Sequence, residues 1–251
     1  SLSGASMKLT GEKVDSNAGW SLWSTEDLNG DMQSDLVIGA KGSGPGTTYV
    51  LFGPLTAGTF SLSGANVKLT GEKVGDEVGS SMTCGDLNGD QMNDLVIGAP
   101  GEDTMGSRSG AVYVLFGPLT AGTFSLSGAS MKLTGEKVDS NAGWSLWSTG
   151  DLNGDMQSDL VIGAPGEDTG VTASPGTTYV LFGPLTAGTF SLSGANVKLT
   201  GEKVGDESGV SVSIAGDLNG DQVNDLVIGA YQNGLSGDHA GSTYVFFGLG
   251  L

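Results

Sequence analysis

Four copies of one acidic loop carry the side chains best suited to chemistry in this chain. The copies are DLNGDMQSD from Asp27 and again from Asp151, DLNGDQMND from Asp86, and DLNGDQVND from Asp217. Each copy places Asp, Asn, Asp and Asp at loop positions 1, 3, 5 and 9. Alternate residues of a tightly curved loop can all point inward, and oxygen atoms arranged in this way bind the hard cation Ca²⁺. The spacing therefore predicts a calcium site in each copy, about four ions in all.

Position 7 is expected to contribute its backbone carbonyl, because its side chain differs in every type of copy. Position 9 is expected to bind through both carboxylate oxygens, earlier in the loop than the closing acid of an EF-hand at position 12. The alternative is an Asx turn without metal, since Asp, Asn and Gly also build turns by themselves. The predicted ligands are Asp27, Asn29, Asp31, Gln33 and Asp35; Asp86, Asn88, Asp90, Met92 and Asp94; Asp151, Asn153, Asp155, Gln157 and Asp159; and Asp217, Asn219, Asp221, Val223 and Asp225.

The net charge of −18 narrows the choice of partners. A surplus of acids makes nucleic acid and anionic membrane surfaces poor partners. Four bound calcium ions would bring the charge from −18 to −10, an ordinary excess for a soluble protein. The apolar runs are too short to span a membrane. A chain of 251 residues with 45 glycines, and without the collagen period, indicates a turn-dense all-β protein.

An internal repeat organises the whole chain. The marker SLSGA starts units at Ser1, Ser61, Ser125 and Ser191, which gives repeats 1–60, 61–124, 125–190 and 191–251 within one domain of residues 1–251. The first and third units are near copies of each other, and the second and fourth share SLSGANVKLTGEKVGDE. The order of the units suggests that a block of two units was doubled.

Each unit reads as four short strands. They are the segment after GEKV, the apolar run LVIGA, the YVLFG segment and the KLTG segment. Because LVIGA is apolar throughout, both of its faces need cover, and a β-propeller of four-stranded antiparallel blades provides it. The chain begins with a strand of the fourth type (Met7 to Thr10) and ends after one of the third type (Tyr244 to Phe247). We therefore expect four blades closed by the N-terminal strand, with an eight-bladed ring of two chains as the alternative.

The second unit, from Val78 to Gly117, resembles the FG-GAP repeat of the integrin α-subunit propeller and its bacterial relatives. The residues that carry the resemblance are VGSSMTCGDLNGDQMNDLVIGAPGED and GAVYVLFG. The resemblance extends to all four units and implies a propeller, structural calcium between the first two strands of a blade, and an extracellular or cell-surface platform for adhesion or ligand binding.

The chain departs from the family pattern in two respects. The family usually has Gly after the third loop acid, where this chain has Met32, Gln91, Met156 and Gln222. If that position needs a positive φ, a residue other than Gly costs about 1 kcal/mol. Family propellers also usually have seven blades, whereas this chain supplies four.

No constellation of catalytic residues is apparent, so we expect no enzymatic activity. His239 is the only histidine and Cys84 the only cysteine, and the latter is expected to be a buried apolar residue. The four tryptophans occur only in the first and third units and are expected to pack between blades. The alternative is a lectin in which one ring of each pair lines a sugar pocket. The four tryptophans are Trp20, Trp23, Trp144 and Trp147.

The ligand, whether protein or glycan, is not identifiable from the sequence. We expect a monomer, with a homodimer as the alternative.

Overall fold

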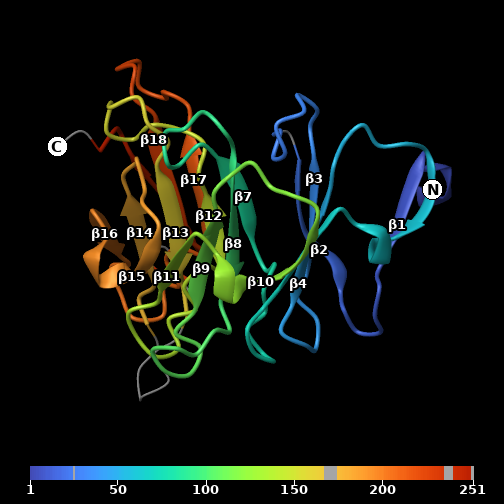
Figure 1. Cartoon of the computed structure of the whole chain (residues 1–251). Helices are drawn as coiled ribbons and strands as arrows, with labels where there is room; N and C mark the ends of the chain where they lie inside the picture. Colours follow the sequence, from blue (N-terminus) through green and yellow to red (C-terminus); the bar gives the residue numbers. More distant parts are fainter. Residues whose placement is uncertain (25, 167–173, 235–239, 250–251) are drawn as a thin grey trace.

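A computed structural model describes residues 1–24, 26–166, 174–234 and 240–249 of the chain (Figure 1). His239 lies outside the described residues. The described part forms β-strands joined by turns and by single-turn 3-10 helices, which confirms the all-β class. It contains no helix with the length and apolar character needed to cross a lipid bilayer.

Three sheets each have an antiparallel part of four strands, and in the described part of the chain a fourth sheet has three; we call these antiparallel parts blades 1 to 4 in chain order. Blade 1 consists of β2 (Ala18–Ser24), β3 (Leu36–Ala40), β4 (Thr47–Leu51) and β6 (Val67–Thr70). Blade 2 consists of β7 (Met82–Gly85), β8 (Asp94–Ala99), β9 (Ala111–Leu115) and β11 (Met131–Thr134). Blade 3 consists of β12 (Ser145–Trp147), β13 (Leu160–Ala164), β14 (Thr177–Leu181) and β16 (Val197–Thr200). Blade 4 consists of β17 (Ser211–Ala215), β18 (Asp225–Ala230) and β19 (Ser242–Phe246). Blades 1 to 3 each take their first three strands from one sequence unit and their fourth from the next.

Short parallel strands, which the sequence analysis did not predict, link neighbouring blades. They have the sequence GTFS and form β5 (Gly58–Ser61), β10 (Gly122–Ser125) and β15 (Gly188–Ser191). The strand β10 runs parallel to β6 of blade 1, and β15 runs parallel to β11 of blade 2. A single-turn helix follows each: η2 (Leu62–Gly64), η3 (Leu126–Gly128) and η4 (Leu192–Gly194). The connecting segment therefore first extends the preceding blade and then completes its own.

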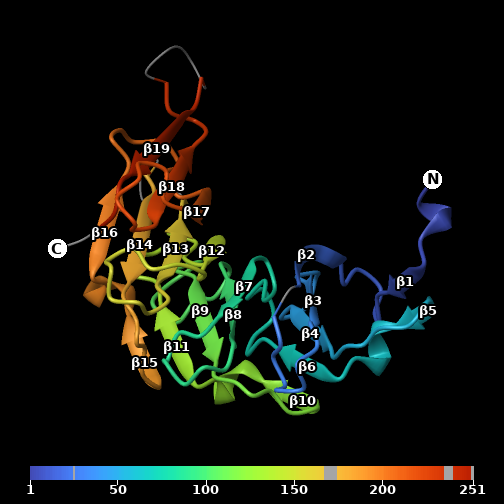
Figure 2. The same ribbon diagram turned by 90° about the horizontal axis from the view of Figure 1, so that it is seen from above.

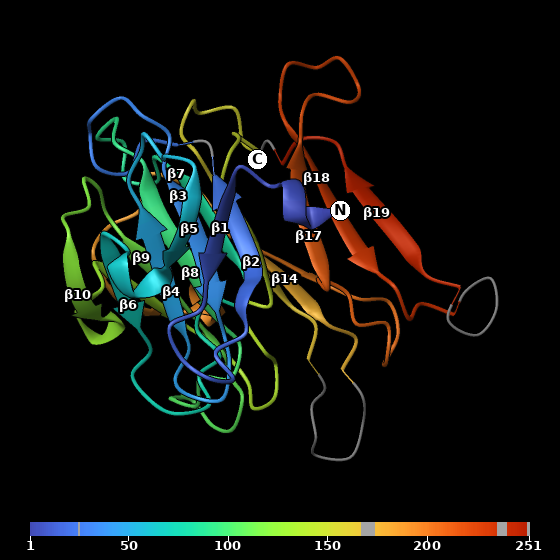
Figure 3. The same ribbon diagram turned by 90° about the vertical axis from the view of Figure 1, so that its right-hand side faces the viewer.

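The predicted closure by the N-terminal strand is not present in this structure. The strand β1 (Met7–Thr10) pairs with β5 in parallel, from Met7 opposite Gly58 to Thr10 opposite Ser61, and does not pair with β19. The reason is that β1 repeats the relation of β6 to β10, so the β1–β5 pair lies beside blade 1 as part of a preceding blade would (Figure 3). The four blades form an open arc with β1 at one end and β19 at the other (Figure 2).

The hydrophobic core lies between the blades, at contacts that we call joint 1–2, joint 2–3 and joint 3–4. The run LVIGA alternates across each sheet, so Ile97 contributes to joint 1–2 while Val96 contributes to joint 2–3. A leucine from the single-turn helix fills each of the first two joints: Leu126 of η3 in joint 1–2 and Leu192 of η4 in joint 2–3. Joint 3–4 has no such leucine among its described core residues.

Candidate metal centre

The first acid of each loop organises the loop backbone. In the first copy, Asp27 Oδ1 accepts hydrogen bonds from the N–H groups of Asn29, Gly30 and Asp31 at 3.1, 2.7 and 3.2 Å. Its Oδ2 accepts one from Met32 at 2.6 Å. Desolvation pushes the pKa of Asp27 upward, but these four N–H donors outweigh it and hold the pKa below its ordinary value. The carboxylate therefore stays ionised at neutral pH.

Positions 3 and 5 continue the same pattern along the rim of the loop. Asn29 Oδ1 accepts a hydrogen bond from the N–H of Asp31 at 3.0 Å, and its Nδ2 donates one to Asp31 Oδ2 at 3.1 Å. Asp31 Oδ1 accepts one from the N–H of Gln33 at 2.8 Å. The same contacts recur in the other loops, with the N–H of Met92, Gln157 and Val223 donating at 2.9 Å in each. The Asx turns considered as the alternative are thus present, and they leave the carboxylates of position 5 on the surface.

The closing acid ties the loop to the third strand of its blade. Asp94 Oδ2 accepts a hydrogen bond from the N–H of Leu87, and its Oδ1 accepts one from Gly117, both at 2.9 Å. The equivalent side chains are almost completely buried: Asp35, Asp94, Asp159 and Asp225 are 2%, 0%, 0% and 0% exposed. Desolvation raises the pKa of Asp94 and of Asp159 to about 6, against the two hydrogen bonds that each accepts. Charge in these loops is therefore costly unless a cation balances it.

The residue after the third loop acid has the left-handed conformation in every copy. Its φ is 64° in Met32, 69° in Gln91, 64° in Met156 and 71° in Gln222. The position after the third loop acid therefore does have a positive φ, the condition under which a residue other than Gly is costly. Each of these side chains strains the loop.

The residue at position 7 packs between neighbouring loops. The side chain of Met92 reaches Gly30 of the preceding loop, Gln157 reaches Gly89, and Val223 lies near Gly154. Three different side chains can serve this purpose, because each only covers a glycine. Sequence reasoning missed this role; that the backbone carbonyl of position 7 binds the ion stays a prediction.

The donor chemistry of the loops fits calcium, because it consists of carboxylate, amide and carbonyl oxygens. No lysine or arginine forms an ion pair with a loop acid in the described part of the chain. The structure does not, however, draw three acidic, histidine or cysteine side chains of the described residues close enough together to share a metal ion. The residue types thus fit the ion, and its binding stays a prediction.

The tryptophans divide into an inner and an outer pair. The rings of Trp23 and Trp147 meet edge to face with centroids 5.7 Å apart, which agrees with the expected packing role. Trp20 and Trp144 are 54% and 38% exposed, and the ammonium of Lys41 lies 3.7 Å and 5.8 Å from their ring centroids.

The surroundings of the cysteine do not favour nucleophilic chemistry. Cys84 is buried as expected, and desolvation raises the pKa of its thiol far above neutral pH. The thiolate, which is the reactive form, is therefore negligible.

Comparison with known proteins gives matches over the same repeats. The family model described as "FG-GAP repeat" matches residues 78–115, 142–181 and 208–246. The chain is 35% identical over 175 residues to human phosphatidylinositol-glycan-specific phospholipase D, a match that covers 62% of this chain and 20% of that protein. It is 28% identical over 231 residues to Drosophila melanogaster integrin alpha-PS2, covering 87% of this chain and 16% of the integrin. Human integrin alpha-7 is 33% identical over 180 residues, covering 65% and 13%. The chain thus spans at most about a fifth of the length of these relatives.

Proposed function

Because the chain belongs to the FG-GAP repeat family, we propose that it is a calcium-stabilised propeller domain that presents a binding or adhesion surface. The observation that carries the proposal is the repeated loop. In each copy a buried acid is anchored by two backbone N–H groups, and acids on the loop surface have no cationic partner among the described residues. A bound calcium ion would supply the missing positive charge.

Within each loop the residues have separable tasks. The acid at position 1 folds the loop around its own carboxylate, and the acid at position 9 joins the loop to the third strand through Gly53, Gly117, Gly183 or Gly248. The acids at positions 1, 5 and 9, the Asn at position 3 and the carbonyl at position 7 would hold the ion. Binding to the folded chain alone stabilises it by mass action, by about 2.7 kcal/mol for one site at a calcium concentration 100 times the dissociation constant.

Thermal unfolding with calcium and with a chelator tests the proposal. We expect the melting temperature of the full chain to fall markedly on chelation and to recover when calcium is restored. Isothermal titration calorimetry of the metal-free chain is expected to give about four sites. An unchanged melting temperature together with no heat of binding would contradict the proposal.

Matched variants make the test specific to the loops. Asp155→Asn removes one surface carboxylate at position 5 but keeps an oxygen that can accept the N–H of Gln157, so we expect one site fewer with little loss of fold. The control is Asp103→Asn, which also removes an exposed carboxylate but lies outside the loops, where it pairs with Lys73. The number of sites in the control is expected to equal that of the unmodified chain.

The remaining parts of the proposal concern placement and partners. We propose that the domain works outside the cell or at its surface, where free calcium is plentiful, and that its role is non-enzymatic. The name of one relative denotes a phospholipase, so its activity is a further possibility to test. A turnover assay on a glycosylphosphatidylinositol substrate is expected to give no product with this chain alone.

A carbohydrate-binding role is the second candidate, and the outer tryptophan pair favours it. Trp20 and Trp144 are exposed, and both rings lie near the ammonium of Lys41. Exposed aromatic faces are suited to stacking against sugar rings. Glycan-array binding that is lost in Trp144→Ala but kept in Thr149→Ala would support this role. No glycan binding by the unmodified chain would eliminate it.

A further inference from the structure

Blade 4 leaves the edge of its last strand without a partner. In blades 1 to 3 the third strand pairs with a fourth strand, as β9 pairs with β11, whereas β19 pairs only with β18 in the described part of the chain. Burial differs as well: Val114 of β9 packs in joint 2–3 and is 0% exposed, whereas the equivalent Val245 of β19 has no following blade among the described residues and is 45% exposed. The edge and outer face of β19 are therefore available to a further strand.

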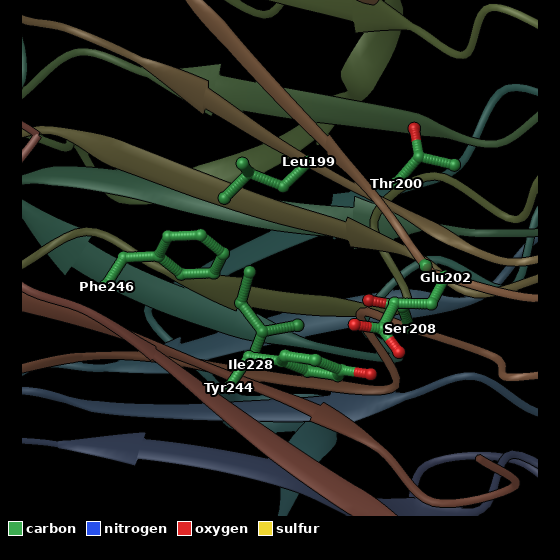
Figure 4. Close-up of a pocket in the computed structure, with 8 residues that line it drawn as sticks. Leu199, Thr200, Glu202, Ser208, Ile228, Tyr244 and Phe246 are labelled. Carbon is green, nitrogen blue, oxygen red and sulfur yellow. The ribbon is translucent and has the colours of Figure 1, made fainter. Parts of the chain in front are cut away.

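A cavity of about 230 Å³ lies beside this edge, between β16 and blade 4 (Figure 4). Leu199, Ile228 and Phe246 form its apolar wall. In joint 1–2 and joint 2–3 the equivalent residues pack against the leucine of a single-turn helix, Leu126 or Leu192. The cavity thus lies where the other two joints have a leucine.

A hydrogen-bonded group of one Glu, one Tyr and one Lys is complete in three places, but beside blade 4 its Lys is missing among the described residues. At one joint Glu72 accepts hydrogen bonds from the hydroxyl of Tyr113 and the ammonium of Lys132, each at 2.8 Å. The group recurs as Glu136 with Tyr179 and Lys198, and as Glu12 with Tyr49 and Lys68. In blade 4 the hydroxyl of Tyr244 faces the carboxylate of Glu202, but no lysine joins them among the described residues. The lysine of each complete group lies on the fourth strand of a blade, and blade 4 has no fourth strand in the described part of the chain.

The first ten residues of the chain have the sequence that would supply both missing parts. Residues 1–10, SLSGASMKLT, are identical to residues 125–134, which form η3 and β11. Leu2 of η1 (Leu2–Gly4) is the counterpart of Leu126 and is 95% exposed. Lys8 of β1 is the counterpart of Lys132, and it too is exposed. In the single chain Met7 and Leu9 of this segment pack against blade 1, whereas Leu2 and Lys8 remain exposed.

We propose that the open edge of blade 4 binds residues 1–10 of a second copy of this chain. By the register of β9 with β11, Met7 would lie opposite Val245 and Lys8 opposite Tyr244. Leu2 would enter the cavity, and the Lys8 ammonium would complete the group of Glu202 and Tyr244. A second copy would thus supply the fourth strand that the predicted ring closure requires in blade 4. This association does not depend on calcium.

The donor is a second copy because β1 is already held at the far end of the arc. It pairs with β5, and Glu12, which follows it, contacts Tyr49 and Lys68 of blade 1. The chain's own β1 can reach β19 only if all the joints bend, because the two strands lie at opposite ends of the arc (Figure 2). A second copy needs no such change.

The outer faces of the two ends also match. Leu22 on blade 1 is 63% exposed, whereas its counterpart Leu146 is 6% exposed in joint 2–3. Blade 1 of one copy therefore offers blade 4 of the other the same kind of surface that blade 3 offers blade 2. Two copies, each giving its N-terminal segment to the other, would make two such joints.

The mass of the full chain in solution gives the first test. Sedimentation equilibrium is expected to show a species of twice the 25.2 kDa chain mass, with dissociation on dilution. A monomer at every concentration would overturn the inference.

Cysteine pairing distinguishes a second copy from the chain's own N-terminus. When Met7→Cys chains and Val245→Cys chains are mixed under oxidising conditions, a disulfide can form only between copies, and we expect a covalent dimer. The native thiol of Cys84 is buried and does not compete. If the mixture gives no dimer while the double variant forms its disulfide within one chain, ring closure by β1 holds and the second copy is excluded. If neither forms a disulfide, both are excluded.

Variants of the contact residues test the register. Leu2→Ala is expected to weaken association about 10- to 100-fold without changing the fold of the single chain, because Leu2 is exposed there. Lys8→Glu and Glu202→Lys are each expected to weaken it, and the double variant to restore it. Lys13→Glu, a charge reversal on an exposed residue outside β1, is the control and is expected to leave the association unchanged. Full association of Leu2→Ala and of both charge variants would overturn the proposed contact.

Discussion

Joint 2–3 and the open edge of blade 4 are built from equivalent segments of the repeat but differ in burial. Val114 is 0% exposed within joint 2–3, whereas its counterpart Val245 at the open edge is 45% exposed. The sequence of the unit therefore does not decide the burial of these residues. The neighbouring blade decides it, and a blade without a neighbour leaves apolar surface in water.

The acidic loops do not differ between these two regions. Asp159 in blade 3 and Asp225 in blade 4 are both 0% exposed, and each accepts the same pair of backbone hydrogen bonds. The loops are thus local structures that each blade forms alone, while the joints need two blades.

Removing the leucine that fills a joint should have the largest effect on stability. Leu192→Ala leaves a cavity in joint 2–3, where Leu192 is 0% exposed, and is expected to lower the free energy of unfolding by about 2–5 kcal/mol. Leu2→Ala, the same change at an exposed position, is expected to have almost no effect in dilute solution where the chain is monomeric. Urea unfolding of both variants measures the contrast, and equal losses would remove the distinction between filled and open joints.

Neutralising the glutamate of a complete charged group should have a smaller effect, and one that depends on pH. The hydrogen bond from Lys198 is the main reason that the pKa of Glu136 lies below its ordinary value. The stabilisation is therefore present above the unfolded-state pKa of about 4.3 and is lost as the pH falls through the lower folded-state pKa. Glu136→Gln is expected to lower the free energy of unfolding by about 0.5–1 kcal/mol at pH 7. It is also expected to reduce the loss of stability as the pH falls through this range.

Glu202→Gln is the matched change at the open edge, where no lysine completes the group among the described residues. It is expected to cost less than Glu136→Gln at pH 7. Thermal unfolding of both variants between pH 3 and pH 7 measures this difference, and a larger loss in Glu202→Gln would contradict it.

Replacing the loop residue of positive φ by Gly should have the smallest effect on stability, and the effect should be the same in both regions. Met156→Gly in blade 3 and Gln222→Gly in blade 4 replace residues with φ of 64° and 71°. Each is expected to raise the free energy of unfolding by about 0.5 kcal/mol, because Gly adopts this conformation without strain but loses more entropy on folding. A gain in one blade and a loss in the other would show that the loops respond to the joints after all.

Features that depend on neighbouring residues in the chain could be predicted from the sequence. The four strands of a blade follow from LVIGA, YVLFG and the turns between them, and three blades have all four. The positive φ at Met32 and its equivalents follows from the family's preference for Gly at that position. The clustering of the loop acids around their own backbone was also foreseeable, although the binding of calcium stays a prediction.

Features that depend on distant parts of the chain could not be predicted. The strand β5 has the sequence GTFS, which shows no apolar alternation, and it becomes a strand only because β1 lies parallel to it. The open arc reflects the angle between packed blades, which no sequence period encodes. Trp20 and Trp144 are likewise 54% and 38% exposed, against the packing role that was expected for them.

The connecting segment, in which a GTFS strand extends one blade and the following KLT strand completes the next, has a consequence for modularity. A chain lengthened or shortened by whole units would still begin with an orphan fourth strand and finish with an orphan third one. If the open edge of blade 4 binds a second copy as proposed, the first and last strands of such chains would pair whatever the number of units. The number of blades in a closed ring of such chains would then be set by the angle between packed blades. Chains with different numbers of units could form rings of the same size.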